Sequence, residues 1–125
     1  MDIVLENVTT GVSGFQLTVR VADPSVATIE GIVFNPGYVD PITGFSFNST
    51  IPLPPASSTT VTAVDLGQAI EPGSSPEFVL FTLQIKLLIS ASTTSVTVSS
   101  VGKLNDDSGA DIIVDQLVPG SVTIN

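Results

Sequence analysis

Carboxylates are the main side chains of this chain that could do chemistry. Its 125 residues include twelve Asp and Glu but no His and no Cys. Catalysis by a Ser-His-Asp or Cys-His arrangement is therefore excluded, and so are metal centres built on imidazole or thiolate ligands. Hydrolysis of glycosides by two carboxylates needs a pair about 5–9 Å apart across a cleft. Most of the acids stand in or beside turn segments, where a solvated surface would place them, so an active site is the weaker interpretation.

One acidic stretch, at residues 105–111, has the composition of a calcium loop. Its sequence is Asn-Asp-Asp-Ser-Gly-Ala-Asp. In the EF-hand pattern the glycine is sixth, which here would put Leu104 first, and a leucine side chain cannot be a ligand. We therefore predict a hairpin turn rich in Asx residues and no metal site. Carbohydrate binding is also disfavoured, since the chain has no Trp and a single Tyr to stack on sugars.

The basic residues are few, and two of them stand in informative places. Only Arg20, Lys86 and Lys103 oppose the twelve acids, so the net charge is −9 and nucleic acid or an anionic membrane surface would be repelled. Arg20 and Lys86 fall on the polar sides of the two clearest strand patterns. Either two solvated faces carry one base each, or the two strands are neighbours and form one surface. Periodicity does not give strand order, so both interpretations stay open.

Period-two alternation predicts the elements that would position these residues. Residues 78–89 alternate large apolar side chains with Thr82, Gln84 and Lys86, and residues 15–21 alternate apolar positions with Gln16, Thr18 and Arg20. Further strands are expected over residues 2–8, 26–34, 44–48, 59–66, 95–103, 110–115 and 120–124.

The arrangement of these strands follows from composition and spacing. Turn signals every 8–12 residues predict a single all-β domain over 1–125, an antiparallel β-sandwich or jelly roll of about nine strands. In 59–66 both sets of alternating positions contain apolar residues, and our interpretation puts Thr62, Val64 and Leu66 inside, with Val61, Ala63 and Asp65 outside. Asp23-Pro24-Ser25 predicts an Asx turn or a single helical turn, the former favoured in so β-rich a chain. The N-terminus carries no signal segment, which suggests an excised domain.

Several motifs in order resemble the cohesin domain, the dockerin-binding β-sandwich of cellulosomal and related cell-surface proteins. The opening Gly11-Val12-Ser13-Gly14-Phe15 with its alternating continuation and the following Asp23-Pro24 are similar to the opening of the family. Residues 94–98, 106–112 and 119–124 are similar to its closing strands and the turn between them, and 61–67 looks especially like cohesin-type domains of archaeal surface proteins. Gly14 and Gln16 stand where many cellulosomal cohesins have other polar residues.

The resemblance implies a jelly-roll sandwich of nine strands that is not an enzyme and binds a dockerin-bearing protein. It implies that calcium belongs to the dockerin, that this domain holds no cofactor, and that the parent protein is extracellular or on the cell surface, in a carbohydrate-related context. The alternative is a spacer or adhesion domain that keeps the fold without binding a dockerin.

The family docks its partner on a sheet that joins strands 8, 3, 6 and 5. With 15–21 as the third strand, we expect 78–89 beside it and Arg20 and Lys86 on one surface. The predicted partner-binding residues are Gln16, Thr18, Arg20, Val61, Ala63, Thr82, Gln84 and Lys86. A rival surface is the edge around 38–58, with Phe45 and Phe47 as anchors.

Overall fold

The chain folds into two antiparallel sheets packed face to face. A computed structural model describes residues 1–6, 11–38, 46–65, 77–89, 92–114, 116–118 and 120–123. The described residues form eight strands and one short 3₁₀ helix, where the sequence suggested about nine strands. The elements are β1 (Asp2–Glu6), β2 (Val12–Val21), β3 (Ala27–Phe34), η1 (Pro36–Tyr38), β4 (Ser46–Ile51), β5 (Ser58–Asp65), β6 (Glu77–Leu87), β7 (Thr93–Asp106) and β8 (Gly120–Thr123). No helix in these ranges is long and apolar enough to cross a membrane.

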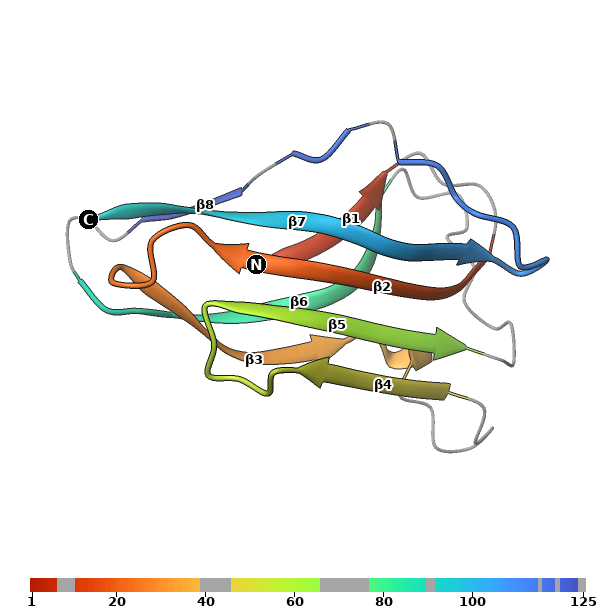
Figure 1. Cartoon of the computed structure of the whole chain (residues 1–125), viewed down its shortest axis with the longest axis horizontal. Helices are drawn as coiled ribbons and strands as arrows, with labels where there is room; N and C mark the ends of the chain where they lie inside the picture. Colours follow the sequence, from red (N-terminus) through yellow and green to blue (C-terminus); the bar gives the residue numbers. More distant parts are fainter. Residues whose placement is uncertain are drawn as a thin grey trace.

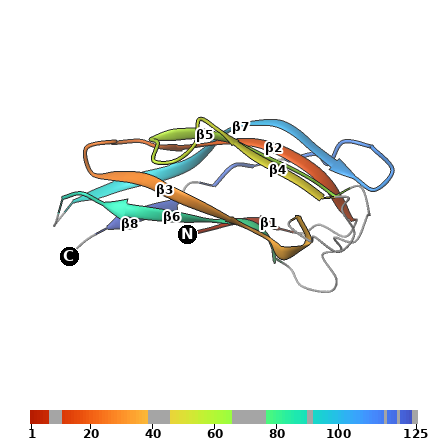
Figure 2. The same ribbon diagram turned by 90° about the horizontal axis from the view of Figure 1, so that it is seen from below.

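The two sheets differ in size. One has five strands in the order β4-β5-β2-β7-β8, and the other has three in the order β1-β6-β3. Every ladder is antiparallel. Figure 1 looks onto the larger sheet, with β1, β3 and β6 behind it, and Figure 2 shows the two layers from the side. The predicted all-β antiparallel sandwich is therefore confirmed.

The prediction that residues 15–21 and 78–89 are neighbours in one sheet is wrong. They lie in β2 and β6, the central strands of opposite sheets. A strand has two hydrogen-bonding edges, and β5 and β7 occupy both edges of β2 while β1 and β3 occupy those of β6. Alternation fixes which way a side chain points along a strand, but it carries no information about the strand next to it.

The core between the sheets is built around aromatic contacts. Phe15 of β2 stacks on Phe81 of β6 with ring centroids 5.6 Å apart, and Tyr38 meets Phe15 edge-on at 5.2 Å. The Tyr38 side chain is fully buried, and its hydroxyl donates to the Val12 carbonyl over 3.1 Å. Burial, together with the nearby carboxylates of Asp65 and Asp107, raises the pKa of this hydroxyl far above its usual range. Tyr38 is therefore a core residue and cannot anchor a partner.

The facing predicted for residues 59–66 is reversed in the structure. Val61 and Ala63 are fully buried and Asp65 is nearly so, whereas Thr62 and Val64 are half-buried on the outer side. The cause is the register with β2, which pairs Leu17 with Val61 and Phe15 with Ala63. Directly paired residues share a face of a sheet, so the inward side chains of β2 bring their β5 partners inward. Leu66 lies outside the described residues.

The segment predicted as a strand at 110–115 forms no ladder in its described part, 110–114. Asp111 makes an isolated bridge with Asn105, and the Ile112 N–H donates to the Leu104 carbonyl. The opposite end of the same edge of β7, at Thr93–Val96, pairs with β8. Only β8 therefore continues the sheet, and Ile113 stays 78% exposed.

The Asx turn predicted at Asp106 is confirmed, and the turn at Asp23 combines both predicted alternatives, because the Asp23 carbonyl also accepts from the N–H groups of Val26 and Ala27 in a single helical turn. The Asp23 carboxylate accepts hydrogen bonds from the Ser25 hydroxyl at 2.6 Å and the Ser25 N–H at 3.0 Å. The Asp106 carboxylate accepts from the Ser108 hydroxyl at 2.7 Å and from two backbone N–H groups, those of Ser108 and Ala110. Gly109 follows with φ of 84°, a conformation that glycine adopts at little cost. Both carboxylates thus close local turns.

Candidate functional site

The outer side of the neighbouring strands β4, β5, β2 and β7 forms one surface. We call it the five-strand face, since it belongs to the five-stranded sheet. Its members are cross-strand partners, so they point the same way. The five-strand face comprises Phe47, Ser49 and Ile51 of β4; Ser58, Thr60, Thr62 and Val64 of β5; Gln16, Thr18 and Arg20 of β2; and Thr97, Ser100 and Lys103 of β7.

The middle of the five-strand face is lined with small hydroxyl side chains. Thr18 and Thr60 share a hydrogen bond of 2.9 Å between their hydroxyl oxygens across the β2–β5 ladder. At the next level, Gln16 pairs with Thr62. Beyond it, Gly14 contributes no side chain, and an added Cβ there would come within 3.3 Å of the Ala63 carbonyl oxygen. This strip is therefore low and uncharged, and it can both donate and accept hydrogen bonds.

Two opposite margins of this surface have different chemistry. On the β4 side, Phe47 is 58% and Ile51 is 71% exposed. On the β2–β7 side stand Arg20 and Lys103, both exposed. The carboxylates at the nearby end of β7 are engaged locally, Asp106 in its turn and Asp107 as the acceptor of the Ser13 hydroxyl at 2.6 Å. The five-strand face thus has an apolar margin and a basic margin.

The outer side of β1, β6 and β3, the three-strand face, has the opposite charge. It carries Asp2, Val4 and Glu6 of β1; Thr28, Glu30 and Val33 of β3; and Thr82, Gln84 and Lys86 of β6. Among the side chains that the structure describes on this face, three carboxylates thus oppose one ammonium group. The Asp2 carboxylate accepts a 2.6 Å hydrogen bond from the Thr82 hydroxyl.

The predicted partner-binding residues therefore do not form one surface. Gln16, Thr18 and Arg20 lie on the five-strand face, whereas Thr82, Gln84 and Lys86 lie on the three-strand face across the sandwich. The two remaining members, Val61 and Ala63, are in the core and cannot touch a partner.

Sequence reasoning missed Lys103 and did not place Phe47 and Ile51 on one surface with Arg20. Register shifts in β7 on either side of Val101 break the alternation that would have marked Lys103. The β4 residues were recognised only as part of a rival edge, and of the two anchors proposed there Phe47 is exposed, while Phe45 lies outside the described residues. Residues 39–45 also lie outside the described residues.

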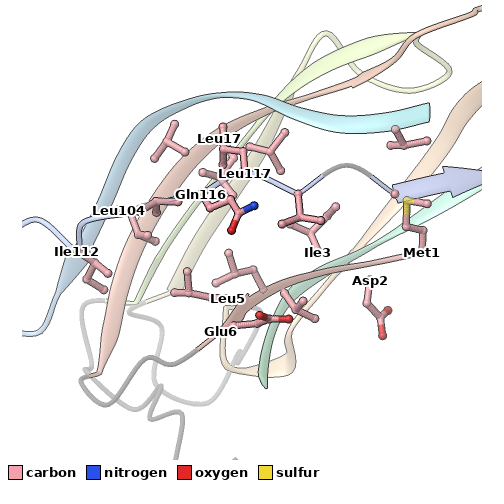
Figure 3. Close-up of a pocket in the computed structure, with 18 of the residues that line it drawn as sticks. Met1, Asp2, Ile3, Leu5, Glu6, Leu17, Leu104, Ile112, Gln116 and Leu117 are labelled. Carbon is pink, nitrogen blue, oxygen red and sulfur yellow. The ribbon is translucent and has the colours of Figure 1, made fainter. Parts of the chain in front are cut away.

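A cavity of ≈ 590 Å³ opens at another edge of the sandwich, between β1, β7 and residues 112–114 and 116–118. Figure 3 shows Ile3 and Leu5 on one wall and Ile112 and Leu117 on the other, with Gln116 extending into the opening. Its two carboxylates, Asp2 and Glu6, lie on the same side of β1 and are four residues apart, about 13 Å at the usual rise, so they do not face each other across the cavity. The described lining therefore lacks the pair of facing carboxylates that glycoside hydrolysis needs.

No group of three or more acidic side chains in the described residues is arranged to hold a metal ion. In the acidic turn at 105–111, two carboxylates accept hydrogen bonds from the turn itself. Asp106 binds Ser108 and Ala110, and the Asp111 carboxylate accepts from the Asn105 amide at 3.0 Å.

Comparison with known proteins identifies the fold as that of cohesin modules. No protein-family model and no curated protein matches the chain. The solution structure of CaCohA2 from Clostridium acetobutylicum superposes with a TM-score of 0.74 at 20% identity, over 98% of this chain and 78% of that one. A chain of the Coh-OlpA cohesin–dockerin complex from Clostridium thermocellum gives 0.73 at 14% identity, over 99% and 86%. The cohesin module of a family 33 glycoside hydrolase from Clostridium perfringens gives 0.61 at 16% identity, over 93% and 75%.

Proposed function

We propose that this domain is a non-catalytic protein-binding module that docks a dockerin-bearing partner on its five-strand face. The observation that carries the proposal is the likeness in fold to cohesin modules over nearly the whole chain, some of them in structures of cohesin–dockerin complexes. The ordered sequence motifs support the same conclusion independently of the structure.

Strand order supports the choice of face. If β2 corresponds to the third strand of the family, as its motif suggests, then each later strand here corresponds to the family strand one number higher. The contiguous strands β7-β2-β5-β4 then correspond to 8-3-6-5, the family's docking sheet. On the same count β6 is the seventh strand, which belongs to the opposite sheet. The three-strand face is therefore not the docking surface in this proposal.

The proposal extends to calcium and to location. Calcium would be held by the dockerin, since Asp106 and Asp111 of the acidic turn accept hydrogen bonds from donors of the same turn and Asp107 accepts from the Ser13 hydroxyl of β2. The domain would act as part of a larger extracellular or cell-surface protein. The parent protein would belong to a carbohydrate-processing context.

Titration with dockerins tests the function directly. Dockerins encoded in the same genome are titrated into the domain by calorimetry, with calcium and with a chelator. We expect at least one to bind with calcium and to be released by the chelator, while the melting temperature of the isolated domain stays unchanged on adding calcium. A calcium site in this domain would instead stabilise the fold by about 2.7 kcal/mol when the free calcium concentration is a hundred times Kd.

Three results would contradict parts of this proposal. Absence of binding by every dockerin would favour a spacer or adhesion role. Strong stabilisation of the isolated domain by calcium would place a metal site in it. Hydrolysis of a polysaccharide that disappears with a single Asp→Asn change would make it an enzyme.

A further inference from the structure

The five-strand face is built in three parallel rows that run along the strands. Phe47 and Ile51 form an apolar row on β4. Thr60 and Thr62 of β5, with Thr18 of β2, form a hydroxyl row in the middle. Lys103 and Arg20 form a basic row on β7 and β2.

The spacing of these rows can be estimated from the register. Phe47 and Ile51 are four residues apart on one strand, about 13 Å at the usual rise. Lys103 pairs with Gln16, four residues from Arg20, so the two bases are about 14 Å apart over one strand spacing. The basic and apolar rows lie two to three strand spacings from each other, about 10–14 Å.

The side chains of the edge strand β4 indicate that a partner covers this surface when the protein functions. An edge strand exposed to water usually carries charges or prolines that prevent association. The sequence of β4, Ser-Phe-Asn-Ser-Thr-Ile, has no charge, and its two large apolar side chains point outward with more than half their surface exposed. Exposed apolar side chains rimmed by polar residues are typical of interaction sites.

Charge indicates what covers it. The protein has a net charge of −9, yet two of its three bases lie together on this face, and none of its described carboxylates points outward there. A partner whose charge complemented the net charge of the whole protein would be basic, and Arg20 and Lys103 would repel it. A partner surface that carries carboxylates would instead be attracted by these two bases.

We propose that the five-strand face selects a partner helix with an apolar side and a row of carboxylates, laid along the strands. The apolar side packs on Phe47 and Ile51, and the carboxylates reach Arg20 and Lys103. A helix is 10–12 Å across with its side chains, so one helix on the hydroxyl row can touch both margins. Two carboxylates about eight residues apart lie about 12 Å apart along its axis, which matches the two bases. This inference rests on the proposed function and specifies the chemistry of its partner.

Charge reversal on the two faces tests the inference. Affinity for a dockerin that binds the wild-type domain is measured at 50 mM and 500 mM NaCl for Arg20→Glu/Lys103→Glu and for the control Lys86→Glu, whose base lies on the three-strand face. We expect at least a tenfold loss for the double variant at low salt, a smaller loss at high salt because exposed charges are screened, and less than a twofold change for the control. Replacing the matching dockerin carboxylates by Lys is expected to restore binding to the double variant.

The outcomes separate this inference from the proposed function. One result is that the double variant keeps the wild-type affinity and an unchanged melting temperature. That result overturns the proposal of an acidic partner helix but leaves the proposal of dockerin binding in place. A loss of equal size at both salt concentrations, without rescue by the Lys-bearing dockerin, also overturns it. If no dockerin binds the wild-type domain, both proposals fail.

Discussion

The two outer faces of the sandwich are built from the same kind of strand but differ in chemistry. Both alternate an apolar inner side with a polar outer side. On the five-strand face the described charges are two bases beside an exposed apolar row, whereas on the three-strand face three carboxylates oppose the ammonium of Lys86. Each face also has exposed apolar residues, Phe47 and Ile51 on one and Val33 at 52% exposure on the other.

This contrast shows that the polar side of one strand does not reveal the charge of the surface it belongs to until the neighbouring strands are known. Arg20 and Lys86 have similar surroundings along their own strands. On each strand the two preceding outward positions hold a Gln and a Thr, and the next residue in the chain is apolar. Their surroundings across the strands differ. Arg20 lies between Ser58 and Thr97, on the same face as Lys103, whereas Lys86 shares a face with Asp2, Glu6 and Glu30.

The largest expected effect comes from breaking the core that holds the two faces back to back. Phe81→Ala removes a fully buried ring that stacks on Phe15 of the other sheet. We expect the free energy of unfolding, measured by urea denaturation, to fall by about 3–5 kcal/mol. The matched control is Phe47→Ala, whose ring is 58% exposed and whose loss should cost less than about 1 kcal/mol. An equal loss of free energy of unfolding in the two variants would mean that the Phe47 ring is buried against the protein and that the apolar row is not an exposed surface.

The next effect tests which face binds. Thr62→Tyr on central β5 and Gln84→Tyr on central β6 each add a bulky neutral side chain to the middle of one face, and tyrosine is well accepted in strands. Because interfaces depend on close packing at their centre, we expect Thr62→Tyr to weaken dockerin binding by about 2 kcal/mol or more. Gln84→Tyr should change it by less than about 0.5 kcal/mol.

Calorimetry on both variants, after thermal unfolding has shown that they fold, gives the comparison. The opposite ranking, with Gln84→Tyr the more damaging, would assign docking to the three-strand face. Equal and small effects would move the interface to the loops at the ends of the sheets.

The smallest effect concerns a turn that belongs to neither face. The Ser108 hydroxyl, with the N–H groups of Ala110 and Ser108, holds the pKa of the Asp106 carboxyl below its ordinary value of 3.8. A carboxyl whose pKa is lowered by folding stabilises the fold above the ordinary value, and this contribution is lost as pH falls through the folded value. We therefore expect the stability of the wild-type domain relative to Asp106→Asn to decrease as pH falls below about 4.

Thermal unfolding between pH 2 and pH 6 measures this difference. Ser108→Ala keeps the carboxylate but removes its strongest donor, so it should reduce the same acid sensitivity. A constant difference between wild type and Asp106→Asn across the range would show that this carboxyl does not contribute through its ionisation. Dockerin binding at neutral pH should be unaffected by either variant, because the turn lies at the end of β7.

The sequence by itself determined the local features of this protein. The alternation in residues 15–21 and 78–89 put Phe15, Leu17, Phe81 and Leu83 in the core, because side chains along a strand point to opposite sides whatever lies next to it. The turns at Asp23 and Asp106 were equally predictable, because each carboxylate finds its donors within four residues. Composition and ordered motifs also indicated the antiparallel sandwich and the resemblance to cohesins.

Only the tertiary structure decided which surfaces exist. The segment 59–66 has apolar residues on both sides, so its facing came from the register with β2, which brings Val61 and Ala63 inward. Lys103 joined Arg20 because register shifts in β7 placed it opposite Gln16. Lys86 was separated from both because β6 pairs with β1 and β3. These outcomes depend on hydrogen bonds between strands that are distant in the chain, and a pattern read along one strand does not contain them.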